Sequence, residues 1–223
     1  MIDPVEALHG ECELVSQLVL GLPEEDFAKP TRLPAWNVKE LLGHMTRGVD
    51  RINVFLDAPP PPAADADAIS YWTRYDPVTD SPAVAARGKA VADEFESGQQ
   101  LAAAWDETWR RATGRAATED RSRLVEVSWG PALTLDEYAK TRVLEVTVHR
   151  MDMENALGLK GWGTDDAISI VDEVLVGLLG EEPPTELEWD AVDFIDTGTG
   201  RRDLTDAERQ ILGDLADRFP LIQ

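Results

Sequence analysis

Three residues of this chain have side chains of the types that bind a divalent metal ion: His44, Glu145 and His149. Glu145 and His149 lie four residues apart in a segment with helical periodicity, so their side chains project from the same side of the expected helix. Two imidazoles and one carboxylate are the protein ligands of a catalytic zinc site that keeps one coordination position open. The residue types therefore favour a site at which an exchangeable ligand is activated.

Two further charged residues, Arg142 and Asp152, share the side of this helix that carries Glu145 and His149. Apolar residues of the segment lie on that side as well, so the charged groups should be buried. Burial of an unpaired charge is costly. Two explanations therefore stay open. Either Arg142 and Asp152 orient metal ligands and balance their charge, or the four groups pair with one another in a structural cluster.

His44 belongs to a second expected helix, which begins at a capping box of Asn37 and Glu40 and continues to about Asp57. Taken alone, a histidine at the edge of an apolar stripe is typical of a hydrogen-bonded core residue. Gly48 follows one turn later and leaves room beside the imidazole for another group to approach. A helical bundle would bring the two helices face to face, which favours the metal site.

The helix starts and breaks of the chain predict an all-α fold, a four-helix bundle with a short, mostly helical C-terminal extension. We expect the bundle to comprise residues 1–160 and the extension residues 161–223. The strand signal is confined to one short hairpin. The expected helices are at 4–21, 37–57, 81–113 with a bend or break near 97–98, 134–158, 164–180, from about 190 and from about 205, where Thr205 and Glu208 form a capping box. A loop is expected at 58–80 and a hairpin at 124–134.

The net charge of the chain argues against some classes of binding partner. Its 43 acidic residues outnumber 21 basic ones and give a formal net charge of -22. Such a chain repels phosphate backbones and anionic lipid headgroups, so we expect neither nucleic acid nor a membrane surface as a partner. No run of eighteen apolar residues predicts a membrane-spanning helix. A small-molecule partner is the remaining expectation.

Cysteine usage and the first residues point to one compartment. Cys12 is the only cysteine, so no intrachain disulfide can form, and apolar neighbours at helical spacing predict a core position for it. The first twenty residues carry three glutamates and no basic start, which is atypical of a secretory signal peptide. We therefore expect a cytoplasmic protein.

Two sequence blocks carry a resemblance to a known family. Residues 33–44, LPAWNVKELLGH, resemble the Pro-Gly-Trp-(Thr/Ser)-Val-x-(Asp/Glu)-Leu-(Leu/Val)-x-His signature of the mycothiol-dependent maleylpyruvate isomerase family, which is part of the wider group of DinB-like metalloenzymes. Residues 142–152, RVLEVTVHRMD, are similar to the Arg-x-x-Glu-x-x-x-His-x-x-Asp block of the same family. The resemblance extends over roughly residues 1–160.

This resemblance implies a DinB-like bundle that holds a divalent metal, usually zinc, through His44, Glu145 and His149. It implies mycothiol as a cosubstrate and an electrophilic small molecule as the substrate. The family's isomerase has a larger C-terminal domain that contributes an arginine near the active site, and the stretch TGRR at 199–202 loosely matches it. Arg201 is therefore predicted either to contact an anionic substrate or to be a surface arginine beside a helix.

Three functions from different classes fit these observations. The first is a thiol-dependent transferase or isomerase, in which a bound metal presents a thiolate and Arg142 and Asp152 orient its ligands. The second is a metal-dependent hydrolase that uses a bound water, with Asp152 as the available general base. The third is a bundle that binds a metal or a small ligand without catalysis, for which a fourth protein ligand such as His9 would be expected.

Overall fold

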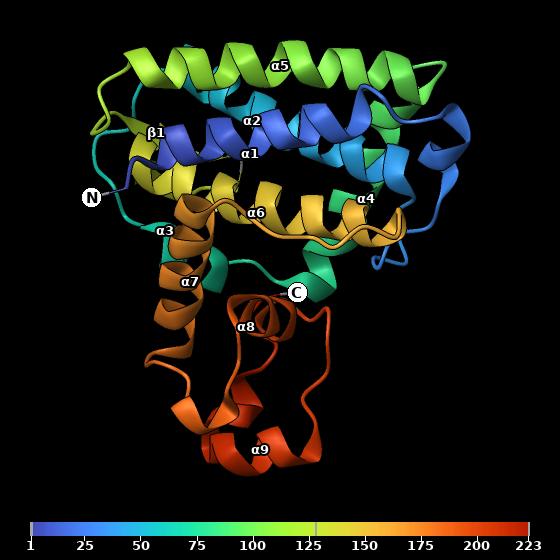
Figure 1. Cartoon of the computed structure of the whole chain (residues 1–223). Coiled ribbons are helices and arrows are strands. Elements are labelled where there is room, and N and C mark those ends of the chain that lie inside the picture. Colours follow the sequence, from blue (N-terminus) through green and yellow to red (C-terminus); the bar gives the residue numbers. More distant parts are fainter. Residues whose placement is uncertain (1, 128, 223) are drawn as a thin grey trace.

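A computed structural model describes residues 2–127 and 129–222 of the chain. Helices dominate it, and a two-stranded antiparallel sheet pairs Leu124 with Thr134 and Glu126 with Ala132 (Figure 1). The helices are α1 (Pro4–Val19), α2 (Val38–Asp57), α3 (Ala68–Thr73), α4 (Pro77–Asp93), α5 (Gly98–Thr118), α6 (Leu135–Ala156), α7 (Asp165–Leu179), α8 (Ala191–Gly198) and α9 (Asp206–Leu212), the strands are β1 (Leu124–Glu126) and β2 (Ala132–Thr134), and short 3-10 helices lie at Glu24–Ala28, Thr185–Leu187 and Gly213–Arg218.

Helices α1, α2, α5 and α6 form the expected four-helix bundle, with α1 packed on α5 and α6 and α2 packed on α5. Trp105 and Trp109 of α5 are fully buried between these helices. The indole Nε1–H of Trp109 donates a hydrogen bond of 2.7 Å to Ser16 Oγ on α1. Cys12 is fully buried, as predicted for a small core residue.

The predicted loop at 58–80 is correct for residues 58–67 but not for the whole segment, and the predicted helix start at residue 81 is wrong. Helix α3 lies within this segment, and α4 begins at Pro77. The side chain of Asp67 caps α3 and that of Asp76 caps α4, as aspartates commonly do at helix starts. The bend or break expected near residues 97–98 is a break, because α4 ends at Asp93 and the Ser97 hydroxyl caps α5.

Helix α6 is buried on nearly all sides, whereas the sequence predicts one buried side. Helices α1, α2 and α7 all pack against it. Six of its polar residues are buried in consequence, and each needs a partner within the protein. These residues are Thr141, Arg142, Thr147, His149, Arg150 and Asp152.

The C-terminal extension lies below the bundle in Figure 1, and α7 and α8 connect it to the rest. A small cluster of Leu204, Leu212 and Ala216 forms its own apolar centre. The capping box predicted for Thr205 and Glu208 is present at the start of α9. The division of the chain at residue 160 stays a prediction. Among the described residues, no helix is long and apolar enough to cross a membrane.

Two glycines allow α4 to approach α2 closely. A Cβ atom added at Gly43 of α2 would lie 2.6 Å from the carbonyl oxygen of Gly88 on α4. One added at Gly88 would lie 2.9 Å from Cβ of His44. Because backbone atoms cannot yield as a flexible side chain does, these contacts require glycine. The α2–α4 contact therefore determines which α4 residues stand beside His44.

We predict that Gly43→Ala lowers the free energy of unfolding by about 1 to 3 kcal/mol, because the added methyl group forces α4 away from α2. Gly114→Ala is the matched control, since a Cβ atom there has no neighbour within 4 Å. That control should stabilise the protein by about 0.5 to 1 kcal/mol through helix propensity. Urea unfolding of both variants provides the measurement. Equal stability of the two would contradict this account of the contact.

Candidate functional site

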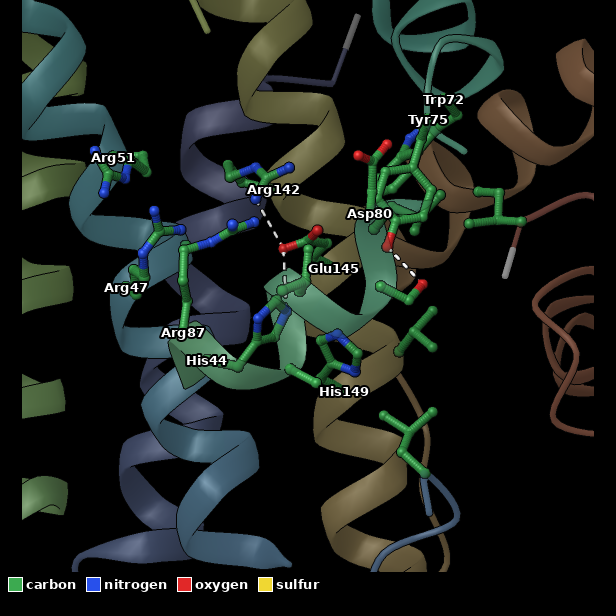
Figure 2. Close-up of a pocket in the computed structure, with 18 of the residues that line it drawn as sticks. His44, Arg47, Arg51, Trp72, Tyr75, Asp80, Arg87, Arg142, Glu145 and His149 are labelled. Atoms are coloured by element: carbon green, nitrogen blue, oxygen red, sulfur yellow. Dashed lines mark hydrogen bonds and ion pairs between the residues drawn. The ribbon is translucent and has the colours of Figure 1, made fainter. Parts of the chain in front are cut away.

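A pocket of about 490 Å³ opens beside α2, α4 and α6. Helix α3, the segment before α2, the hairpin and the C-terminal extension complete its walls. His44 reaches it from α2, and Glu145 and His149 reach it from α6 (Figure 2). Its volume is in the range of small-molecule and cofactor sites. The structure thus brings the three predicted ligand residues to one cavity, although more than 100 residues of sequence separate His44 from the other two.

The three side chains are neighbours at the pocket wall. Nε2 of His44 lies 3.8 Å from Oε2 of Glu145. The rings of His44 and His149 are 5.0 Å apart between centroids and nearly perpendicular, at 84°. Within residues 2–127 and 129–222, no three His, Cys, Asp or Glu side chains have the arrangement of a metal-binding group. The role of these residues as metal ligands therefore stays a prediction.

Arg142 holds the carboxylate of Glu145. Its Nη1 donates a hydrogen bond of 2.7 Å to Oε2 of Glu145, and its Nη2 donates one of 3.0 Å to the hydroxyl of Tyr71. Burial opposes ionisation of Glu145. The positive charge of Arg142 and its hydrogen bond outweigh burial, so the pKa of Glu145 lies below its usual range. The carboxylate is therefore ionised and fixed in position.

Asp152 fixes the ring of His149. Nδ1 of His149 lies 3.1 Å from Oδ2 of Asp152, and the carboxylate is fully buried. Burial would raise the pKa of Asp152, but the hydrogen bond from His149 and the charge of Arg201 hold it well below its usual range. An ionised Asp152 can accept a hydrogen bond from Nδ1–H of His149, which leaves Nε2 as the ring nitrogen available to a ligand.

Two arginines from outside the bundle complete the contacts of Asp152. Nη2 of Arg201 lies 2.9 Å from Oδ2, and Nε of Arg32 lies 3.0 Å from Oδ1. Arg32 also donates to Asp196 of α8 at 2.9 Å. The alternative prediction of a surface position for Arg201 is wrong, because its side chain is only 9% exposed and lines the pocket. The sequence contains no motif that singles out Arg32.

His44 is a neutral imidazole. Burial, with the positive charge of Arg142, lowers its pKa to about 3, although Glu145 acts in the opposite direction. The indole of Trp36 stacks on the ring at a centroid distance of 4.6 Å and an angle of 23°. Trp36 therefore positions a side chain of the pocket.

The other histidine lies away from the pocket. Nδ1 of His9 is 3.2 Å from the hydroxyl of Thr113, and its ring packs edge-on against Trp109 at 4.9 Å. His9 does not line the cavity, so it is not a fourth ligand for an ion bound there. Asp152 is also absent from the lining, because its oxygens face His149 and two arginines. A role as the base for a pocket water is therefore disfavoured.

A family model described as the mycothiol maleylpyruvate isomerase N-terminal domain matches residues 8–154. The chain belongs to this family. Among solved structures, a crystal structure of a histidine-to-alanine mutant of mycothiol-dependent maleylpyruvate isomerase is similar, with a TM-score of 0.53 and 14% sequence identity. The match covers 82% of this chain and 70% of that one. The fold is thus the DinB-like bundle with a short helical extension. A search of curated proteins finds no match.

The buried, neutral state of His44 predicts a pH dependence of stability. Its folded pKa of about 3 lies below the usual 6.5, so the unfolded chain binds an extra proton between these values. The free energy of unfolding of metal-free protein should therefore fall as the pH drops below about 6.5, by at most about 1.4 kcal/mol per pH unit. His44→Gln should remove this part of the slope.

Unfolding in denaturant between about pH 6.5 and 5.5, with a chelator present, measures the effect above the range in which most ordinary carboxylates titrate. The free energy of unfolding should depend more steeply on pH in the wild-type protein than in His44→Gln. Parallel pH dependences for the two proteins would show that His44 is not held neutral by burial.

Proposed function

We propose that this protein is a divalent-metal-dependent transferase or isomerase that activates a low-molecular-weight thiol at the pocket of His44, Glu145 and His149. Zinc is the metal we propose, and mycothiol is the proposed cosubstrate because the family carries it in its name. The observation that supports this most is the meeting of two imidazoles and one carboxylate at an open cavity. The proposal also includes a cytoplasmic location, where cellular thiols are kept reduced.

The residues present fit a metal by their chemistry. His44 is neutral and His149 is directed by a carboxylate, as in the common arrangement of a metal-ligating histidine. Glu145 is ionised and accepts from Arg142, as ligating carboxylates often do from an outer partner. Nε2 of His44, Nε2 of His149 and the Glu145 carboxylate would hold the ion. When bound, a divalent ion would lower the pKa of a thiol so that a thiolate is present at neutral pH.

The residues of the chain then have separate tasks. Arg142 balances the charge of Glu145 and keeps its carboxylate from rotating. Asp152 acts through His149 and is a positioning residue. Arg201 lines the pocket with its guanidinium already held by Asp152 and by the carbonyl of Thr199, so its side chain is rigid. A rigid cation at this wall is suited to orient an anionic part of a substrate.

Two alternatives predict different outcomes from the same pocket. A hydrolase would need a base near a bound water, and the burial of Asp152 removes the residue that the sequence offers for that task. A bundle that binds a ligand without catalysis would give metal binding without turnover. The tests below separate these functions from the thiol-dependent one.

The first test is metal content. Each of His44→Ala, Glu145→Ala and His149→Ala should lower the metal stoichiometry of the purified protein from about one to near zero, because a site of three protein ligands depends on all of them. His9→Ala is the control, since this imidazole lies outside the pocket. Plasma emission spectrometry of the purified proteins gives the answer. Full metal content in His149→Ala would overturn the assignment of the site.

The second test concerns the thiol and Asp152. Cobalt-substituted protein should develop a thiolate-to-metal charge-transfer band when mycothiol is added. Asp152→Asn should keep the metal and lower turnover by about 10- to 100-fold, the usual size of such an indirect effect. Hydrolysis of simple esters without any thiol-dependent band would favour the hydrolase. Metal-loaded protein that shows neither the thiol-dependent band nor ester hydrolysis would favour the non-catalytic bundle.

A further inference from the structure

The charge of the pocket is opposite to that of the chain. Acidic residues outnumber basic ones by 43 to 21 in the sequence, yet only Asp80 and Glu145 are acidic among the residues that line the cavity. Five arginines line it: Arg47, Arg51, Arg87, Arg142 and Arg201. A concave wall of one charge sign attracts ligands of the other sign. The charge of the whole molecule therefore does not predict what this pocket binds.

Within the described residues, two of these arginines form ion pairs and three do not. Arg142 is paired with Glu145 at 2.7 Å, and Arg201 is paired with Asp152 at 2.9 Å. Arg47, Arg51 and Arg87 make no hydrogen bond and no ion pair with any residue of the described ranges 2–127 and 129–222. We call these three residues the arginine cluster.

The fold brings the arginine cluster together at an energetic cost. Arg47 and Arg51 are four residues apart on α2, where like charges repel. Arg87 joins them from α4, because the contact between Gly43 and Gly88 holds the two helices close. Partial burial, with the charges of Arg51 and Arg87, lowers the pKa of Arg47. Repulsion of this kind is relieved when an anion binds.

Aromatic side chains form the facing part of the wall. Figure 2 shows Trp72 and Tyr75 across the pocket from Arg47 and Arg51. Trp129 packs between Tyr71 and Tyr75, with ring centroids at 4.8 and 5.7 Å, and also lines the cavity. Flat aromatic surfaces favour a planar apolar group beside them. The pocket thus combines a cationic wall with a surface suited to an unsaturated or aromatic body.

We propose that the arginine cluster of Arg47, Arg51 and Arg87 is a subsite for a doubly charged anionic group, either a phosphate monoester or a pair of carboxylates, on a planar small molecule. A guanidinium group binds two oxygens of such an anion at once, and three of them exceed what a single carboxylate needs. The subsite deepens the proposed function, because it would hold the substrate whose reacting atom faces His44 and His149. Its existence can nevertheless be tested without any metal.

Four probes with the same ring separate charge from shape: phenyl phosphate, phthalate, benzoate and benzamide. Their binding to the full-length purified protein is measured by calorimetry, with and without a chelator. Phenyl phosphate or phthalate should bind at least about tenfold more tightly than benzoate, and benzamide should bind most weakly. The tighter of the two dianions identifies phosphate or carboxylate as the preferred group. Equal affinity for benzamide and both dianions would overturn the proposal.

Substitutions locate the binding. Arg47→Gln and Arg87→Gln should each weaken dianion binding by about tenfold. Lys89→Gln is the control, because it removes the same charge from α4 at a residue outside the pocket. The melting temperature of the free Arg47→Gln protein should stay the same or rise, since one repulsive charge is lost. Unchanged dianion affinity in both arginine variants would overturn the proposal, as would a melting temperature that falls together with the affinity.

His149→Ala and the chelator test whether dianion binding depends on the metal site or on the arginine cluster. Dianion binding that survives both, but is lost in the arginine variants, supports the subsite even if the proposed metal chemistry fails. Dianion binding that disappears on chelation and is unaffected by Arg47→Gln belongs to the metal. That result would overturn the subsite and leave the proposed function intact.

Discussion

The buried carboxylate of Asp152 is the interaction on which the arrangement of the pocket depends. It binds His149 on its own helix, Arg32 from the segment before α2 and Arg201 from the C-terminal extension. A carboxylate accepts about four hydrogen bonds, so one group can organise three elements that are distant in the sequence. The orientation of His149 and the contact between Arg201 of the extension and the bundle both depend on the charge of Asp152. A neutral residue at this place would leave two arginines facing each other inside the protein.

The position of α6 explains why so many charged groups meet here. Because three helices cover it, most of its polar residues are shielded from bulk water and pair with other groups of the protein or face the pocket, as Arg150 pairs with Glu11 of α1. Glu145 and Arg142 form one such pair, and His149 and Asp152 form another. In each pair, one side chain with a metal-ligand atom lines the pocket, and its partner balances its charge or fixes its orientation. The same physical requirement, satisfaction of buried polar groups, thus yields side chains that are fixed before any ligand arrives.

Much of the pocket is built by parts outside the four bundle helices. The α2–α4 contact, which depends on Gly43 and Gly88, brings Arg87 to one wall, and the extension brings Arg201 to another. The family match ends at residue 154, before the extension. His44, Glu145 and His149 thus lie on bundle helices, whereas Arg87 and Arg201 reach the same pocket from α4 and from the C-terminal extension.

The sequence alone determined the helical class, the hairpin, the caps at Asn37 and Thr205 and the set of three ligand-type residues, because periodicity, capping and spacing are local properties. It did not reveal α3, since a short helix rich in aromatics has little periodicity, nor the burial of α6 on several sides. Only the tertiary structure decided that Arg32 and Arg201 share Asp152, and that Arg87 stands near Arg47. These contacts join residues between 40 and 120 positions apart. The proximity of Arg47 and Arg87 requires the close approach of α2 and α4 at two glycines, and the contacts of Asp152 require the pairing of buried charges. Neither requirement can be read from neighbouring residues in the sequence.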